Sequence, residues 1–287
     1  MTEWVCINGE LRPAESASVS VFDAGFMQGV GLFETMRAYR GRVFRLEQHL
    51  DRLAASARTL GWSVIPDPEE TGANVARVLT ELGAQDGRVR LTVTSGSLRG
   101  AAGAEPELTI VASATLGGTY AAELYERGAT VVVSRYRQSR FDPTVGHKTT
   151  SYFARLAALR GAHAAGALEA LWLDDNGQVA EGAVSSVFAV RGGRVHTPAL
   201  DTPILPGITR AAVLELAAEL EVMVEERALA VGDLCAAEEV FLTNSMMEVM
   251  PVVSVGGERI GAGRPGEVTR RLAQAYARRV REECGHD

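Results

Sequence analysis

The alternation of strand-like and helical segments breaks once along this chain, at Leu116-Gly117-Gly118. Before the break, apolar residues in helical spacing predict helices from Leu46 to Leu60 and from Glu69 to Leu82, each followed by a glycine. With 287 residues, the chain is long enough to bury a core on both sides of the break. Strands are expected before the break at Trp4–Asn8, Val19–Phe22, Thr35–Tyr39, Arg42–Phe44, Val89–Thr94 and Leu108–Ala114.

After the break, short strands separated by turn residues predict a second sheet. The turn Asp175-Asn176-Gly177 is a strong hairpin pattern. Strands are expected at Thr130–Ser134, Leu171–Asp174, Gln178–Val179, Val184–Val190, Arg194–His196, Glu238–Thr243 and Val252–Val255, and helices from Ser151 to Ala165, from Ile208 to Leu220 and from Glu267 to Glu283. The sequence therefore predicts an α+β chain of two domains, residues 1–117 and 118–287.

Charge and composition narrow the classes of partner. The formal net charge of −7 argues against a nucleic-acid or other polyanion-binding protein, which usually carries a basic patch. No apolar run approaches the roughly 18 residues that cross a membrane, and Met1-Thr2-Glu3 shows no start of a secretory signal. The three cysteines are far apart and have no metal-ligand spacing, so we expect a cytoplasmic protein without disulfides or a metal site.

The basic residues are unusual because only one of the 29, Lys148, is a lysine. Arginine replaces lysine at most solvated positions, but its guanidinium cannot supply a deprotonated primary amine. An arginine-biased composition with one lysine left by chance is the plainer explanation. Lys148, however, lies between a strand-like segment and the start of an Ala-rich helix, where a nucleophilic amine that forms Schiff bases is equally expected.

Four further segments carry polar groups that suit a bound ligand, although each also has an ordinary structural explanation. Glu181 follows a predicted hairpin strand and either faces solvent or pairs with a ring nitrogen. Gly207 and Thr209 open a predicted helix, where N–H groups bind phosphate or are simply capped. Arg52 lies off the apolar stripe of its helix, as a surface cation or a phosphate clamp. Thr243-Asn244-Ser245 ends an apolar strand and projects hydroxyl and amide groups.

Taken in order along the chain, these segments resemble the motifs of the fold-type IV pyridoxal-phosphate enzymes, the class IV aminotransferase family. That group contains branched-chain and D-amino acid aminotransferases, certain amine transaminases and 4-amino-4-deoxychorismate lyases. The resemblance covers nearly the whole chain. The motifs that carry it are Gly31–Arg37, His49–Leu53, Lys148, Glu181-Gly182 with Ser185–Phe188, Pro206–Thr209 and Phe241–Ser245.

The resemblance implies pyridoxal phosphate as the cofactor and a role for each matching position. Lys148 would form the aldimine with the cofactor and later move a proton between the substrate Cα and the cofactor. Glu181 would pair with the pyridine nitrogen, and Tyr152 would lie near the phenolic oxygen, although it follows the lysine one residue sooner than in branched-chain enzymes. Ser186 stands where the family often has Asn. The residues implied to hold the phosphate are Arg52, Ile208, Thr209 and Ser245.

Three residues are candidates for binding substrate. Phe33 replaces a tyrosine of some D-amino acid enzymes and leaves a more apolar wall. Arg99 lies in the loop where those enzymes bind a carboxylate, although a solvated arginine is as common there. Met246 belongs to the run Thr243–Pro251, which is similar to the corresponding run of the deoxychorismate lyases.

The resemblance implies a smaller N-terminal α+β domain, a larger C-terminal domain with a barrel-like β core, and a homodimer. The expected function is a transaminase that moves an amino group from a D-amino acid, a branched-chain L-amino acid or an amine to a 2-oxo acid, through the lysine aldimine and pyridoxamine phosphate. The alternative is a 4-amino-4-deoxychorismate lyase that releases pyruvate and 4-aminobenzoate. A non-catalytic binding protein is a third possibility, and the retention of Lys148 as the sole lysine argues against it.

Overall fold

The computed structural model describes residues 3–83, 85–98 and 107–285 of the chain. Contacts divide it into two compact units, and each is described by itself. The first unit contains the residues up to 118, together with two later segments, residues 147–151 and those from 280 onward. The second unit contains residues 119–146 and 152–279.

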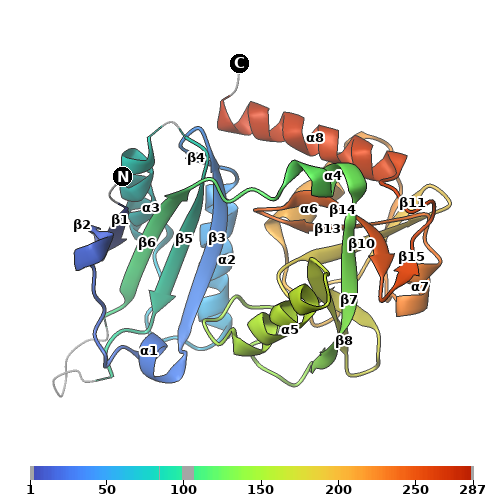
Figure 1. Ribbon diagram of the computed structural model, residues 1–287. Helices are drawn as coiled ribbons and strands as arrows, with labels where there is room; N and C mark the ends of the chain where they lie inside the picture. The colour runs from blue at the N-terminus through green and yellow to red at the C-terminus, as the bar shows by residue number, and fades with distance from the viewer. Residues whose placement is uncertain (1–2, 84, 99–106, 286–287) are drawn as a thin grey trace. The chain divides into compact units, whose positions relative to one another are not determined.

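The first unit is built on a six-stranded antiparallel sheet in the order β2-β1-β6-β5-β3-β4 (Figure 1). Its side chains alternate between two faces, because successive residues of a strand point to opposite sides. One face, with Met36, Val89 and Ala112, packs on the apolar sides of α2 and α3. The strands are β1 (Trp4–Ile7), β2 (Glu10–Pro13), β3 (Gly31–Tyr39), β4 (Arg42–Val43), β5 (Gly87–Thr94) and β6 (Thr109–Leu116), and the helices are η1 (Ala14–Ser16), α1 (Ala24–Gln28), α2 (Leu46–Thr59) and α3 (Pro68–Leu82).

Local chemistry explains where these elements begin and end. The Asp67 side chain accepts a hydrogen bond from the Glu70 N–H at 2.9 Å, and Pro68 follows at the first position of α3, which is a standard helix start. Arg40 and Gly41 adopt positive φ angles of 48° and 78°, as the turn between β3 and β4 requires. Helix α3 thus begins one residue before the start expected at Glu69 and ends at Leu82 as expected.

The strand expected at Val19–Phe22 is wrong, because this segment forms turns that lead into α1. Ser20 Oγ accepts from the Phe22 N–H at 3.1 Å, and Asp23 Oδ1 accepts from the Gly25 N–H at 2.8 Å. Such local side-chain bonds compete with a strand ladder. Val19 and Val21 are 52% and 62% exposed, so the segment also lacks the buried face that would hold it in a sheet.

The second unit is built on a nine-stranded mixed sheet in the order β12-β11-β10-β13-β14-β7-β8-β9, with β15 paired to β14 (Figure 1). Parallel pairs join β7 to β14 and to β8, and β9 returns to contact β10, which curls the sheet. The strands are β7 (Ala129–Gln138), β8 (Glu169–Asp174), β9 (Val179–Gly182), β10 (Ser186–Arg191), β11 (Arg194–Thr197), β12 (Val224–Glu226), β13 (Glu239–Asn244), β14 (Glu248–Val255) and β15 (Glu258–Arg259).

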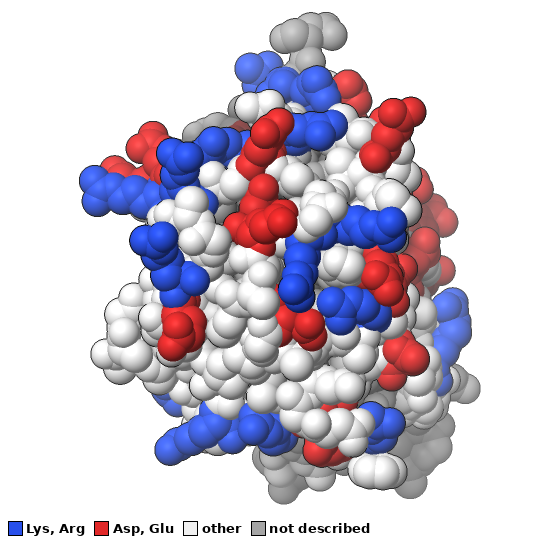
Figure 2. Space-filling view, turned by 90° about the vertical axis from the view of Figure 1, so that its right-hand side faces the viewer, with Lys and Arg blue, Asp and Glu red and all other residues white. Residues whose placement is uncertain are grey.

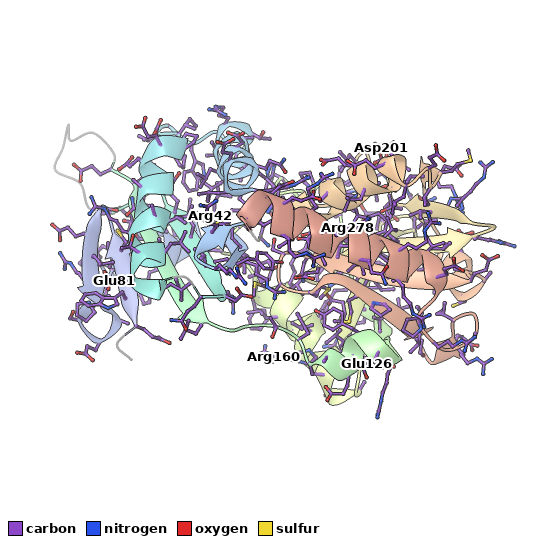
Figure 3. The ribbon with its side chains drawn as sticks, turned by 90° about the horizontal axis from the view of Figure 1, so that it is seen from above. Arg42, Glu81, Glu126, Arg160, Asp201 and Arg278 are labelled. Atoms are coloured by element: carbon purple, nitrogen blue, oxygen red, sulfur yellow. The ribbon has the colours of Figure 1, made fainter. Side chains whose placement is uncertain are left out.

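Several helices pack against the strands of this sheet. Helix α5 packs on β7 and β8 through Ala158 and Ala162, while Arg160 on its other side is exposed (Figure 3). Acidic and basic side chains are interspersed on the face seen in Figure 2, without a broad basic patch there. The helices are α4 (Ala122–Arg127), α5 (Phe153–Ala164), α6 (Ile208–Glu219), α7 (Val231–Cys235) and α8 (Glu267–Cys284). No helix among the described residues is long and apolar enough to span a membrane.

Candidate active site

Lys148 lies in the first unit, in a short extended segment held against β3. The Phe33 N–H donates to the Lys148 carbonyl at 2.8 Å, and the Thr150 N–H donates to the Gly31 carbonyl at 2.8 Å. A β-bridge between Leu32 and Thr149 lies between these two bonds. Backbone bonds at the Lys148 carbonyl and at the Thr150 N–H therefore fix where the lysine side chain starts.

The close approach of this segment depends on small residues in β3 and before it. A Cβ atom on Gly31 would lie 2.8 Å from Thr150 Oγ1, and one on Gly29 would lie 2.7 Å from Ser151 Oγ. Gly29 also has a φ of 69°, which L side chains rarely adopt. Thr150 Oγ1 donates to the Gly29 carbonyl at 2.8 Å, so the glycines allow a contact that the threonine completes.

The amine of Lys148 faces an aromatic ring that a second cation also touches. Lys148 Nζ lies 4.5 Å from the centroid of the Phe33 ring, and the guanidinium carbon of Arg90 lies 3.4 Å from the same centroid. Arg90 Nε and Nη1 donate to the hydroxyls of Thr92 and Thr35. Sequence reasoning missed Arg90. Strand alternation would have found it, because Arg90 lies opposite Thr35, which shares a face with Phe33.

Beneath this sheet lies a buried charge network around Glu34. Its carboxylate accepts from Arg52 Nε at 2.8 Å, from Arg52 Nη2 at 2.6 Å and from His49 Nδ1 at 2.8 Å. Burial alone would raise the pKa of Glu34, but Arg52 and His49 outweigh it and hold the pKa at about 2. Burial, together with the charges of Arg52 and Lys148, lowers the pKa of His49 despite the opposing effect of Glu34. His49 is therefore a neutral hydrogen-bond donor, and Arg52 is the counter-ion of Glu34.

Glu181 lies in the second unit at the end of β9, where it is 3% exposed. Its Oε1 accepts from Arg155 Nη2 at 2.6 Å and from Gln138 Nε2 at 3.0 Å. Its Oε2 accepts from the Leu205 N–H at 3.0 Å, three residues before the start of α6. The carboxylate thus ties β9 to the segment that leads into α6.

A second buried carboxylate, Glu169, shapes the loop after Glu181. It accepts from the N–H groups of Ala183 and Val184, each at 3.1 Å, and from Ser185 Oγ at 2.9 Å. Burial raises the pKa of Glu169, and these donors offset part of that effect. A Cβ on Gly182 would lie 2.1 Å from Ser185 Oγ and 2.9 Å from Glu169 Oε2, so a larger residue would have to displace one of these hydrogen-bonded groups.

The start of α6 has the character of an anion cradle. Ile208 and Thr209 are buried in its first turn, and the N-cap residue Gly207 supplies no side-chain hydrogen bond. A Cβ on Gly207 would lie 2.8 Å from Ser186 Oγ, so the missing side chain leaves room in front of the helix. Among the described residues, the buried hydroxyl of Thr243, which lies opposite Ser186, has no hydrogen-bond partner. The N–H groups at the start of α6 and the nearby hydroxyl of Thr243 are donors that fit the phosphate of the expected cofactor.

Asn244 and Tyr152 are held by the same part of the second unit. Asn244 Nδ2 donates to the Val184 carbonyl at 2.9 Å, and its Oδ1 accepts from the Met246 and Met247 N–H groups at 2.8 Å. This fixes the turn that carries Ser245 and Met246. The Tyr152 hydroxyl donates to the Ala183 carbonyl at 3.2 Å.

The residues expected from the sequence therefore fall into two groups, one in each unit. The first unit holds Lys148, Phe33 and Arg52, and the second holds Glu181, Tyr152, Ile208, Thr209, Ser245 and Met246. Arg99 lies outside the described residues. Besides Arg90, sequence reasoning missed three charged residues that organise these groups, namely Glu34, Arg155 and Glu169.

A model of the amino-transferase class IV family matches residues 31–255 of this chain. The chain belongs to this family. A putative branched-chain-amino-acid aminotransferase of Methanocaldococcus jannaschii is 36% identical over 95% of this chain and 94% of its own length. The crystal structure of the Escherichia coli branched-chain amino acid aminotransferase has a TM-score of 0.89 at 31% identity and covers 96% of this chain and 94% of its own.

A third relative bears on the cofactor. The branched-chain amino acid aminotransferase from Thermobaculum terrenum, solved in its PLP-form, has a TM-score of 0.86 at 25% identity, over 100% of this chain and 95% of its own. PLP is pyridoxal phosphate, so the expected cofactor is confirmed at the level of the family. The fold-type IV architecture with its curled sheet and the aminotransferase class are confirmed as well.

Proposed function

We propose that this chain is a pyridoxal-phosphate-dependent transaminase that moves an amino group from an amino acid or amine to a 2-oxo acid. The observation that carries the proposal is the fixed amine of Lys148, the sole lysine of the chain, facing the Phe33 ring at 4.5 Å. Backbone bonds at Lys148 and Thr150 hold this segment against β3, so the side chain starts from a fixed position. A solvated surface lysine would need neither feature.

Residues of both units have roles in this proposal. The bound cofactor would supply an aldehyde for amines and a ring that takes up electrons. Lys148 would hold the cofactor covalently and, once the substrate has displaced it, take the proton from the substrate Cα. Arg52 would meet the phosphate, with Glu34 fixing its guanidinium through two hydrogen bonds. Tyr152 would lie near the phenolic oxygen.

Within the second unit, one hydrogen bond supports a common site for ring and phosphate. Glu181 Oε2 accepts from the Leu205 N–H, which lies directly before Pro206-Gly207 and the first turn of α6. A carboxylate for the ring nitrogen and N–H groups for the phosphate are therefore only a few residues apart. We assign Glu181 to the ring nitrogen, and Ile208, Thr209 and Ser245 to the phosphate.

For the substrate, we propose branched-chain L-amino acids and their 2-oxo acids, as the names of the relatives suggest. Phe33 would form an apolar wall beside the amine, and Met246 a second one. Arg90, stacked on the Phe33 ring at 3.4 Å, would bind the substrate carboxylate. It takes the role that the sequence suggested for Arg99.

A panel of amino donors tests the substrate. Each of L-leucine, L-valine, D-alanine, D-glutamate and (R)-1-phenylethylamine is incubated with 2-oxoglutarate, and formation of the new amino acid is measured. A parallel assay measures 4-aminobenzoate from 4-amino-4-deoxychorismate. We expect turnover with L-leucine and L-valine. Product in the lyase assay alone would overturn the transaminase proposal.

The role of Lys148 is tested by trapping. Wild-type protein is mixed with pyridoxal phosphate and reduced with borohydride, which converts a Schiff base into a stable amine. Mass spectrometry should find one cofactor on the peptide containing Lys148 and none on the Lys148→Ala protein. A covalent adduct of equal yield in Lys148→Ala would show that another amine, such as the N-terminus, is the attachment point.

A further inference from the structure

The carboxylate that we assign to the cofactor ring is paired with an arginine of this chain. Arg155 Nη2 donates to Glu181 Oε1 at 2.6 Å, and both side chains are largely buried, at 21% and 4% exposure. Gln138 Nε2 donates to the same oxygen at 3.0 Å. Oε2 accepts a single hydrogen bond among the described residues, from the Leu205 N–H.

Arg155 is itself held on several sides. Its Nη1 donates to the Ala183 carbonyl at 3.0 Å and to the Gly182 carbonyl at 3.4 Å, which are the residues directly after Glu181. Its guanidinium carbon lies 5.5 Å from the Trp172 ring and 5.9 Å from the Tyr152 ring. Tyr136 stacks in turn on Trp172, with ring centroids 5.8 Å apart. A planar cation that contacts two aromatic rings and donates to three acceptor groups has little freedom to rotate.

The position of Arg155 in its helix indicates that its ion pair with Glu181 is not incidental. It is the third residue of α5, and the helix dipole disfavours a cation in the first turn. Burial lowers the pKa of Arg155, but Glu181, together with Tyr152 and Glu169, raises it above its usual value. Both burial and the helix dipole disfavour a cation at this position, so we attribute the presence of Arg155 to its ion pair with Glu181.

We propose that Arg155 is the positioning residue for Glu181. It occupies Oε1 and thereby turns Oε2 toward the cofactor ring, while its bonds to the 182 and 183 carbonyls keep the end of β9 in place. Because Arg155 is a permanent cation, it also stabilises the ionised form of the Glu181 carboxylate that would contact the ring nitrogen. This inference rests on the proposed function, because it takes Glu181 as the partner of the ring nitrogen.

The competing explanation is that Arg155 only cross-links β9 and α5. Breaking a buried pair then lowers stability without any specific effect on the cofactor. The two explanations differ in cofactor affinity, in the absorption of the bound cofactor and in the coupling to Glu181. None of these readouts depends on turnover.

The test compares Arg155→Met, Arg155→Lys and, as a matched control on the exposed side of the same helix, Arg160→Met (Figure 3). We expect Arg155→Met to raise the Kd of pyridoxal phosphate about 10- to 100-fold, as loss of a charge-assisted contact does. It should also shift the visible absorption maximum of the bound cofactor. Lysine keeps the charge but not the planar group with several donors, so Arg155→Lys should give a Kd and an absorption maximum between those of wild type and Arg155→Met. The control should match wild type.

A double-mutant comparison isolates the coupling. In a Glu181→Gln background, Arg155→Met should change the Kd by less than about twofold, because the group through which it acts is gone. A wild-type Kd and absorption maximum in Arg155→Met would overturn the proposal, as would equal losses in the Met and Lys variants. If Arg155→Met does not fold, Arg155→Gln is judged by the same criteria.

Failure of this inference can be told apart from failure of the proposed function. If wild-type protein takes up no cofactor and borohydride traps none on Lys148, the proposed function is wrong. If wild-type protein binds the cofactor and Arg155→Met binds it equally well, only the role of Arg155 is wrong.

Discussion

At the scale of single residues, Arg90 offers the clearest test of substrate binding. Replacing it with methionine should raise KM for a carboxylate-bearing donor about 10- to 100-fold, because a charge-assisted hydrogen bond is lost. The KM for an amine donor that has no carboxylate should not change. Steady-state kinetics with L-leucine and (R)-1-phenylethylamine measures both. Arg88→Met, exposed on the same strand, is the control, and equal losses with both donors would contradict the assignment.

Glu34 gives a prediction about acid stability. A carboxyl whose pKa is depressed to about 2 in the folded protein stabilises it fully above its unfolded value of about 4.5, and this stabilisation disappears as the pH falls toward 2. Glu34→Gln, which leaves Arg52 buried without its counter-ion, should lower the free energy of unfolding at pH 7 by about 3 kcal/mol.

Urea denaturation at several pH values measures this effect. The gap between wild type and Glu34→Gln should narrow as the pH falls from about 4.5 toward 2. Glu15→Gln, at an exposed position in η1, should follow the wild-type curve throughout. A gap that stays constant down to pH 2 would mean that ionised Glu34 is not the stabilising form.

At the scale of elements, the start of α6 should be sensitive to a single methyl group. In Gly207→Ala, the new Cβ would lie 2.8 Å from Ser186 Oγ and fill the space in front of the helix. We expect cofactor affinity, measured by fluorescence titration, to fall about tenfold, which corresponds to roughly one lost hydrogen bond. Gly161→Ala, in open space on α5, should leave the affinity unchanged. Unchanged affinity in Gly207→Ala would remove α6 from the cofactor site.

The elements also show which parts of the molecule a sequence can predict. The helix expected from Glu69 to Leu82 follows from apolar spacing and from Gly83 at its end, and α3 begins one residue earlier, at Pro68, after the Asp67 cap. The strand at Val19–Phe22 was wrong because alternation alone does not show whether a face is buried. Arg155 was missed for a related reason, since an arginine on a helix looks solvated until the fold brings Glu181 to it. Local chemistry predicts boundaries, whereas charge pairs across distant elements require the fold.

At the scale of the whole molecule, the first unit exposes apolar side chains around α1. Phe26 is 76% exposed, Met27 55% and Val21 62%, an arrangement typical of an interaction surface. If the expected homodimer forms there, Phe26→Asp should shift the molar mass measured by light scattering from dimer toward monomer. Met223→Asp, which is 58% exposed in the second unit, should leave the mass unchanged. A Phe26→Asp protein that stays dimeric would place the interface elsewhere.

The division of the chain into two interleaved units limits where the genes of two family members can be recombined. The backbone passes between the units after residues 118, 146, 151 and 279, and the five residues that carry Lys148 belong to one unit while their chain neighbours belong to the other. A genetic crossover at the break near residue 118 would therefore separate the reactive amine from Gly31 and Phe33, which hold it. Neither unit is a transferable module, and chimaeras of family members should succeed only when both partners of these backbone bonds come from the same parent.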